Sequence, residues 1–243
     1  MDEQQRIEAT TMTAARQKSG LPDEIKSFVQ KEFRQGYGQA RSPARSQPCW
    51  RRLRELGTQL WLDTGSMEDA AELWSREFSA LTTNNTLLNK EVQKGTYDEI
   101  VSDAGEILSS HGELSRQQVL REVAFILNAR HALRLVERFG AYVSVEEHTD
   151  LAGDIEATVR CAKRYHDICP ERFIVKIPYT PAGILAARRL SAEGVPVNQT
   201  LGFSARQNYV LARVANPRYA NVFLGRLNAF VADNSLGPGS GVG

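Results

Sequence analysis

The chain has 243 residues and a formal net charge of +1, with 42% hydrophobic and 24% charged residues. These values are typical of a soluble globular protein and give no reason to expect a nucleic acid or a membrane surface as partner. No apolar run is long enough to span a membrane, and the polar, acidic start argues against a secretory signal. We therefore expect a cytoplasmic protein.

Residues 1–50 differ from the rest because they are rich in Gln, Arg and Ser and contain few aliphatic side chains. Within them, Ile25, Phe28, Val29 and Phe33 share one helical face, which predicts a single amphipathic helix. The following residues 36–50 are expected to form a linker. The sequence thus predicts a polar N-terminal extension over residues 1–50 and a folded domain over residues 51–243.

From Leu60 onward, short apolar runs alternate with segments of helical periodicity. The predicted strands are residues 59–64, 79–84, 141–146, 173–178, 195–201 and 221–226. The predicted helix-capping residues are Ser66, Thr96, Ser115 and Thr180. Gly140 and Gly194 each follow a periodic segment, where a glycine commonly ends a helix.

Repeated alternation of strands and helices predicts a parallel sheet covered by helices, either an open doubly wound sheet or a closed (β/α)8 TIM barrel. No glycine-rich nucleotide-binding motif follows a strand, which weakens the first option. Polar residues instead gather at the carboxyl ends of the strands, as in barrel enzymes. They are Asp63, Thr82, Thr83, Asn84, Glu146, Lys176, Asn198, Thr200 and Arg226. This pattern favours the barrel.

Lys176 stands in the otherwise apolar strand FIVKIP. Burial disfavours the charged form of an amine and leaves a fraction of free amine that can attack a carbonyl and form a Schiff base. Such an adduct is an electron sink for making or breaking a neighbouring C–C bond. The alternatives are a lysine that reaches solvent between helices and one that pairs structurally with an acid.

Asp63 and Glu146 are carboxylates at the ends of strands that carry no other charge. Schiff-base chemistry needs proton transfers at a carbinolamine and at a substrate hydroxyl, and both acids are candidates for this work. Asp63 could instead cap the next helix, although Ser66 fits that position better. Glu146 could instead be a solvated loop acid beside Glu147.

Neutral polar groups near the same strand ends could hold a polyhydroxylated ligand, although such residues are also common in turns. The candidates are Thr82, Thr83, Asn84, Asn198, Thr200 and, as a weaker one, Ser204. Arg226 follows Gly225 and suits a phosphate, because guanidinium binds phosphate in a bidentate manner; a structural ion pair is the alternative. Cys161, His166 and Cys169 match no common zinc pattern, so reduced thiols and no metal site are expected.

Six segments of the chain, in order, resemble the transaldolases from about Leu53 to the C-terminus. They are LWLDT, ALTTNNT, VSVE, FIVKIPYT, VNQTLGFS and FLGRLN. The resemblance implies a (β/α)8 barrel of the class I aldolase type that needs no metal or organic cofactor. It also implies transfer of a dihydroxyacetone unit from sedoheptulose 7-phosphate to glyceraldehyde 3-phosphate, in the pentose phosphate pathway. Sugar phosphates are the implied partners, and a homo-oligomer is possible.

The resemblance assigns roles to four catalytic residues. Lys176 matches the Schiff-base lysine of the family, and Asp63 matches the acid that handles the substrate hydroxyl proton during C–C cleavage. Glu146 matches the carboxylate that acts through a bound water as general acid and base at the carbinolamine. Thr200 matches the threonine that helps to hold this water.

The resemblance also assigns substrate contacts and exposes two departures. Asn84 and Asn198 match asparagines that bind donor-sugar hydroxyls, and Arg226 matches the phosphate-binding arginine. The usual TTNP of the family reads TTNN, with Asn85 in place of proline. Asn221 replaces a serine that often helps to bind phosphate, so the phosphate contacts are expected to be rearranged.

A third departure is length: six strands are recognisable, whereas the family barrel has eight. We therefore expect an incomplete barrel that is poorly stable and weakly active or inactive alone. Two other functions remain open, a fructose-6-phosphate aldolase-like lyase and an inactive phosphosugar-binding or interaction protein. Glu146 favours the transaldolase, because the lyase branch of the family lacks that acid.

Overall fold

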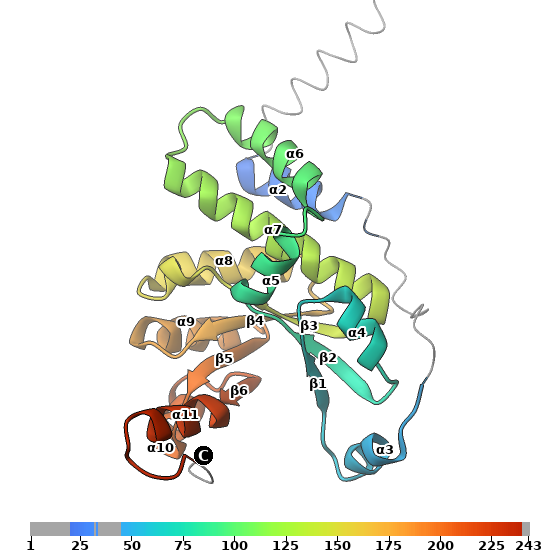
Figure 1. Cartoon of the computed structure of the whole chain (residues 1–243). Coiled ribbons are helices and arrows are strands. Elements are labelled where there is room, and N and C mark those ends of the chain that lie inside the picture. The colour runs from blue at the N-terminus through green and yellow to red at the C-terminus, as the bar shows by residue number, and fades with distance from the viewer. Residues whose placement is uncertain (1–19, 32, 34–44, 240–243) are drawn as a thin grey trace, which may run out of the picture.

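A computed structural model describes residues 20–31, 33 and 45–239 and contains one six-stranded parallel sheet (Figure 1). The strands are β1 (Leu60–Asp63), β2 (Phe78–Thr82), β3 (Tyr142–Glu146), β4 (Phe173–Pro178), β5 (Val197–Gly202) and β6 (Tyr219–Val222). They pair in chain order from β1 to β6, and every pair is parallel. With its flanking helices this sheet forms a partial (β/α) barrel, which confirms the predicted fold class. Five strands lie where the sequence predicts them, whereas the sixth begins two residues earlier and ends at Val222.

Helices follow each strand and cover the outer face of the sheet (Figure 1). The helices of the described part of the chain are α2 (Leu21–Gln30), α3 (Pro48–Glu55), α4 (Met67–Leu73), α5 (Asn85–Val92), α6 (Asp98–Ser109), α7 (Arg116–Phe139), α8 (Ile155–Ile168), α9 (Pro181–Ala192), α10 (Ala205–Val214) and α11 (Leu224–Asp233). Of these, α2 and α3 precede β1, and α2 and α6 pack on other helices. A short 3-10 helix, η1 (Thr149–Leu151), precedes α8. No helix within the described ranges is both long and apolar enough to cross a membrane.

Three of the four predicted helix caps are confirmed. The side chains of Ser66, Ser115 and Thr180 each accept a hydrogen bond from a backbone N–H in the first turn of α4, α7 and α9. The prediction at Thr96 is wrong, because Tyr97 takes the cap position of α6 without a side-chain cap. Gly95, with φ of 77°, turns the chain just before this helix, so the Thr96 hydroxyl stands one residue too early for its first turn.

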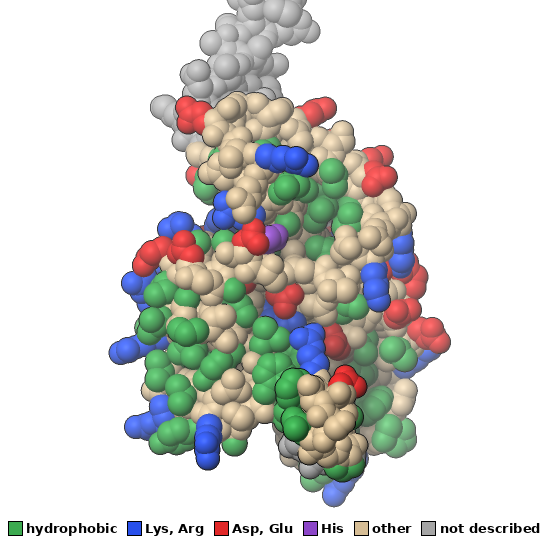
Figure 2. All heavy atoms as spheres, turned by 60° about the vertical axis from the view of Figure 1, so that its left-hand side comes forward, with side chains coloured by type: hydrophobic (Ala, Val, Ile, Leu, Met, Phe, Trp, Pro, Cys, Tyr) green, Lys and Arg blue, Asp and Glu red, His purple; other side chains and the backbone are tan. Residues whose placement is uncertain are grey.

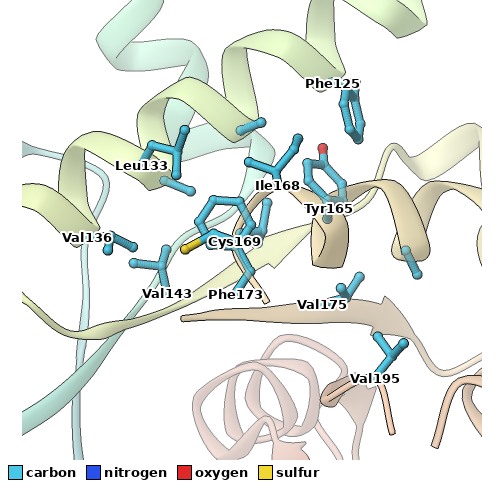
Figure 3. Packing of buried hydrophobic residues seen from close by; sticks show 14 of the residues in the cluster. Phe125, Leu133, Val136, Val143, Tyr165, Ile168, Cys169, Phe173, Val175 and Val195 are labelled. Atoms are coloured by element: carbon cyan, nitrogen blue, oxygen red, sulfur yellow. The ribbon is translucent and has the colours of Figure 1, made fainter. Parts of the chain in front are cut away.

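The core lies between the sheet and the α7–α8 layer (Figure 3). Val143, Phe173 and Val175 point from β3 and β4 toward Leu133 of α7 and Ile168 of α8, and all five are at most 3% exposed. Burying each such side chain stabilises the fold by about 1.5–3 kcal/mol. Because strand side chains alternate, this packing directs the other side chains of β3 and β4 to the opposite face of the sheet.

The predicted N-terminal helix is α2, and it packs against α7 and α8. Ile25 and Val29 are fully buried in the main core, with Phe28 and Phe33 partly buried against it. The predicted linker falls mainly outside the described residues. Its last part, residues 48–50, is not a linker but the start of α3, because a proline at the first helical position favours helix.

The two end strands of the sheet approach each other through side chains on its inner face. The rings of Trp61 on β1 and Tyr219 on β6 pack edge to face with centroids 4.6 Å apart. The Tyr219 hydroxyl also donates a hydrogen bond to Oε1 of Gln59, at 3.2 Å. The sheet is therefore curved enough for its first and last strands to touch.

Candidate active site

The candidate residues on the strands share the face of the sheet that points away from the helices. Asp63 pairs in register with Thr82, and Lys176 pairs with both Glu146 and Asn198. Alternation along each strand places the following side chains on this face: Asp63, Thr82, Glu146, Lys176, Asn198, Thr200 and Asn221. In Figure 2, basic and acidic side chains lie next to each other near the centre of the view, between hydrophobic surfaces.

Lys176 is buried within this face, with 6% of its surface exposed. Its Nζ lies 3.3 Å from Oε1 of Glu146 and donates a hydrogen bond to the backbone oxygen of Thr83, at 3.1 Å. A buried ammonium would be costly without such partners. The lysine therefore does not reach solvent between the helices, and its amine is held beside a carboxylate.

Glu146 is held from two sides and remains accessible, since its side chain is 20% exposed. Its Oε1 faces Lys176, and its Oε2 accepts a hydrogen bond from the backbone N–H of Asn85, at 3.0 Å. The alternative of a solvated loop acid is wrong, because Glu146 ends β3 and its carboxylate is engaged on both oxygens. This geometry allows proton exchange between the carboxylate and a group bound at the amine.

Two buried polar atoms near the amine have no hydrogen-bond partner among the described residues, namely Oδ1 of Asn198 and Oγ1 of Thr82. The Nδ2 of Asn198 donates to Oγ of Ser144, at 3.0 Å, which fixes the asparagine side chain. A buried polar atom without a partner destabilises a protein by about 1–3 kcal/mol. The hydroxyl groups of a ligand could satisfy both atoms.

Asn221 and Thr200 lie side by side at the ends of β6 and β5. The Nδ2 of Asn221 lies 3.5 Å from Oγ1 of Thr200, a weak hydrogen bond. Thr200 is buried, with 2% of its surface exposed. The structure thus brings the predicted Thr200 next to the residue that replaces the serine of the family.

Three other predicted residues lie at the rim. Asp63 is exposed at the end of β1 and does not cap α4, since Ser66 does so. Asn84 and Ser204 are helix caps, whose oxygens accept backbone N–H groups of α5 and α10. Ser204 forms a complete capping box with Gln207, which engages its hydroxyl within the helix start. For Asn84 only Oδ1 has such a partner in the described structure, so its Nδ2 is open to a ligand.

Arg226 is not at the end of a strand, as the sequence predicted, but in the first turn of α11. The sixth strand is residues 219–222, and the N–H of Phe223 bonds to the backbone oxygen of Gly202 before the helix begins. Arg226 is exposed, and its guanidinium lies 4.7 Å from the ring centre of Phe223. It forms no ion pair with a described residue, which leaves its charge available to an anion.

A metal site at the cysteines finds no support in the described part of the chain. Cys49, Cys161 and Cys169 are free thiols, and no group of three His, Cys, Asp or Glu residues there could hold a metal ion. Burial raises the pKa of the Cys161 thiol well above its ordinary value, so this thiol stays protonated.

The sequence of the chain is similar to those of known proteins. The model of the family "Transaldolase/Fructose-6-phosphate aldolase" matches residues 60–240. The chain belongs to this family. A probable transaldolase of Thermus thermophilus is 37% identical over 172 residues, which are 70% of this chain and 64% of the relative. A transaldolase of Xanthomonas euvesicatoria is 29% identical over 194 residues, which are 77% of this chain and 59% of the relative. The chain thus spans less than two thirds of the length of these transaldolases.

The sequence analysis did not single out Ser144 or Asn128, and it named Glu147 only as the neighbour of Glu146. Ser144 precedes Glu146 by two residues, so strand alternation could have placed it on the same face. The Glu147 side chain points to the opposite face of the sheet, and the residue is 1% exposed. Burial raises its pKa to about 8, the charge of Glu146 adds to this, and a hydrogen bond from Thr158 opposes it. Glu147 is therefore mainly uncharged at neutral pH.

Proposed function

We propose that the chain carries out the transaldolase reaction through a Schiff base on Lys176, at the low rate expected of six strands where the family barrel has eight. The observation that carries the proposal is the contact of 3.3 Å between the buried amine of Lys176 and the accessible carboxylate of Glu146, in a chain of the transaldolase/fructose-6-phosphate aldolase family. A nucleophilic amine needs a neighbouring group that moves protons as water is lost and regained. Glu146 is the only carboxylate in ion-pair contact with Lys176 among the described residues.

The first half of the reaction opens the donor sugar. The free amine of Lys176 attacks the ketone carbon of sedoheptulose 7-phosphate, and the carbinolamine loses water with a proton supplied by Glu146 through a bound water. Asp63 then takes the proton of the hydroxyl next to the C–C bond that breaks. Erythrose 4-phosphate leaves, and the electron pair of the broken bond stays on the three-carbon unit as an enamine.

The second half reverses these steps on a new acceptor. The enamine attacks the aldehyde carbon of glyceraldehyde 3-phosphate, and the new alkoxide recovers the proton from Asp63. Water hydrolyses the Schiff base, which releases fructose 6-phosphate and the amine of Lys176. The protonated Schiff base on Lys176 provides the electron sink, so the proposal calls for no metal and no organic cofactor.

Substrate contacts are proposed for the polar residues around the amine. Asn84, Thr82 and Asn198 would bind hydroxyls of the three-carbon unit, since each carries a side-chain atom without a partner in the described structure. Arg226 would bind the phosphate, with Asn221 in the place of a serine. Thr200 would hold the water used by Glu146. We assign Ser204 a minor part at the rim, because its hydroxyl is engaged in a capping box.

The test is an assay with separate donor and acceptor. Sedoheptulose 7-phosphate and glyceraldehyde 3-phosphate together should yield erythrose 4-phosphate and fructose 6-phosphate, detected by mass spectrometry, and either sugar alone should not turn over. Release of free dihydroxyacetone from fructose 6-phosphate at a similar rate would indicate a lyase instead. Binding of either sugar phosphate without any product would contradict catalysis. A transferase of this kind belongs to the pentose phosphate pathway and to the cytoplasm, which we include in the proposal.

A further inference from the structure

Asn85 is the first residue of α5 and stands where the transaldolase pattern has proline. A proline has no N–H to donate. In this chain the N–H of Asn85 donates to Oε2 of Glu146, at 3.0 Å, and its Nδ2 donates to the backbone oxygen of Glu147, at 3.2 Å. A single residue therefore binds both the carboxylate beside Lys176 and the backbone that follows it.

Asn128 of α7 holds the side chain of Asn85 in place. Its Nδ2 donates to Oδ1 of Asn85 and to the backbone oxygen of Ala124, both at 3.1 Å. Asn128 is 6% exposed, so these bonds are screened little by water. With its oxygen occupied in this way, the Asn85 amide directs its nitrogen toward Glu147.

The local charges favour this arrangement. Glu146 and Glu147 are adjacent, but Glu147 is buried and mainly uncharged at neutral pH. The carboxylate of Glu146 stands at the end of β3, and the N-terminus of α5 points an N–H group at it. One oxygen of Glu146 is bound by Asn85, which leaves the other oxygen for Lys176.

We propose that Asn85 is a positioning residue for Glu146. Its main-chain N–H fixes Oε2, so that Oε1 stays directed at the amine of Lys176 during proton transfer, and Asn128 holds Asn85 in that position. This inference rests on the proposed role of Glu146. It predicts that loss of the N–H slows the formation of the Schiff base and leaves the binding of the sugar nearly unchanged.

The decisive variant is Asn85→Pro, which removes both the N–H and the amide. A proline is favoured at the first position of a helix, and Asn84 already has an extended backbone (φ −153°, ψ 166°) that suits the residue before a proline. The variant should therefore fold. Asn85→Ala removes the amide and keeps the N–H. Thr86→Ala, at the exposed next position of the same helix, is the matched control.

The measurement is the rate at which fructose 6-phosphate forms an adduct that borohydride can trap, followed at a series of sugar concentrations. Asn85→Pro should lower the maximal rate about tenfold, with the half-saturating concentration changed less than about twofold. Asn85→Ala should lose less, and Thr86→Ala should match the unmodified chain. In a Glu146→Gln background, Asn85→Pro should cause little further loss, because Asn85 acts through the proton transfer that Glu146→Gln has already removed.

The outcomes distinguish a failure of this inference from a failure of the proposed function. An adduct in the unmodified chain, with Asn85→Pro as fast as Asn85→Ala, would overturn the positioning role and leave the proposed function standing. An equal further loss in the Glu146→Gln background would overturn it as well, since the effect would not act through Glu146. Absence of any adduct in the unmodified, folded chain would overturn both.

Discussion

The amine nitrogen of Lys176 lies 3.3 Å from a carboxylate oxygen of Glu146, and the two residues are direct partners across β3 and β4. Parallel strands in register thus place a nucleophile and a proton-transfer group side by side. The lysine is buried and its partner is partly exposed, so a ligand can approach the carboxylate side. This relationship is the basis of the proposed mechanism.

Replacing Glu146 by Gln should slow Schiff-base formation about a hundredfold, because the amide cannot accept or return a proton. Gln has nearly the same shape and can still accept the hydrogen bond from the N–H of Asn85. The rate of borohydride-trapped adduct with fructose 6-phosphate measures the effect. An unchanged rate would show that Glu146 takes no part in the proton transfers.

Replacing Arg226 by Ala should weaken the binding of fructose 6-phosphate about tenfold, because a charge-assisted hydrogen bond to the phosphate is lost. The matched control is Arg213→Ala, which removes an exposed arginine of the neighbouring helix α10. Titration of both variants with the sugar phosphate gives the comparison. Equal affinities of the two variants would remove Arg226 from the phosphate site.

Glu147 should make the fold less stable as the pH rises. Its pKa is about 8 in the folded chain and about 4.5 when exposed, so between these values the folded state holds a proton that the unfolded state has lost. The free energy of unfolding should fall by at most about 5 kcal/mol from pH 4.5 to pH 8. Glu147→Gln should remove this slope and stabilise the protein at pH 8. Urea unfolding at several pH values tests it, and identical slopes for both proteins would contradict it.

His131 should make the fold less stable as the pH falls. Burial lowers its pKa to about 4, the positive charge of Arg134 adds to this, and its Nδ1 shares a hydrogen bond of 2.7 Å with the Tyr97 hydroxyl. Below pH 6.5 the unfolded state binds a proton that the folded state does not, so stability falls as the pH drops toward 4. His131→Gln should flatten that decline by at most about 3 kcal/mol. If the decline persists unchanged in this variant, another group causes it.

Gly183 is the position where an added methyl group should disturb the end of β4. A Cβ atom there would lie 2.2 Å from the backbone oxygen of Pro178 and 3.1 Å from Oγ1 of Thr180. Gly183→Ala should therefore lower stability by about 1–3 kcal/mol, seen as a lower melting temperature. Gly105→Ala, within α6 and with no atom near the added Cβ, should instead raise stability by about 0.5–1 kcal/mol. Equal effects of the two substitutions would contradict the crowding at Gly183.

The sheet, and the positions of most candidate residues on it, could be predicted because strand alternation is a short-range rule. Polar residues stand two positions apart in β3 and β5, and parallel pairing brings them beside Lys176 of β4. Lys176, Glu146 and Asn198 were therefore identifiable from their strands alone. Alternation continued one residue past the end of β3 directs the Glu147 side chain to the opposite face of the sheet, toward the helices.

Other features depend on tertiary contacts that spacing does not encode. The run NVFLGR is as apolar as a strand, yet Phe223 ends the pairing and α11 carries Arg226. The hydrogen bond from Asn85 to Glu146 comes from a backbone group at a helix start, which side-chain patterns do not reveal. The packing of α2 on α7 and α8 required the folded structure as well.

The central claim is that Lys176 is a nucleophile that forms a Schiff base with a ketose phosphate. The most direct test is to add fructose 6-phosphate and borohydride to the purified chain and to its Lys176→Ala variant, followed by intact mass and peptide mapping. We predict a single covalent adduct on the peptide that contains Lys176, and no adduct in the variant. No adduct in the unmodified folded chain, or an adduct of equal yield in Lys176→Ala, would contradict the claim.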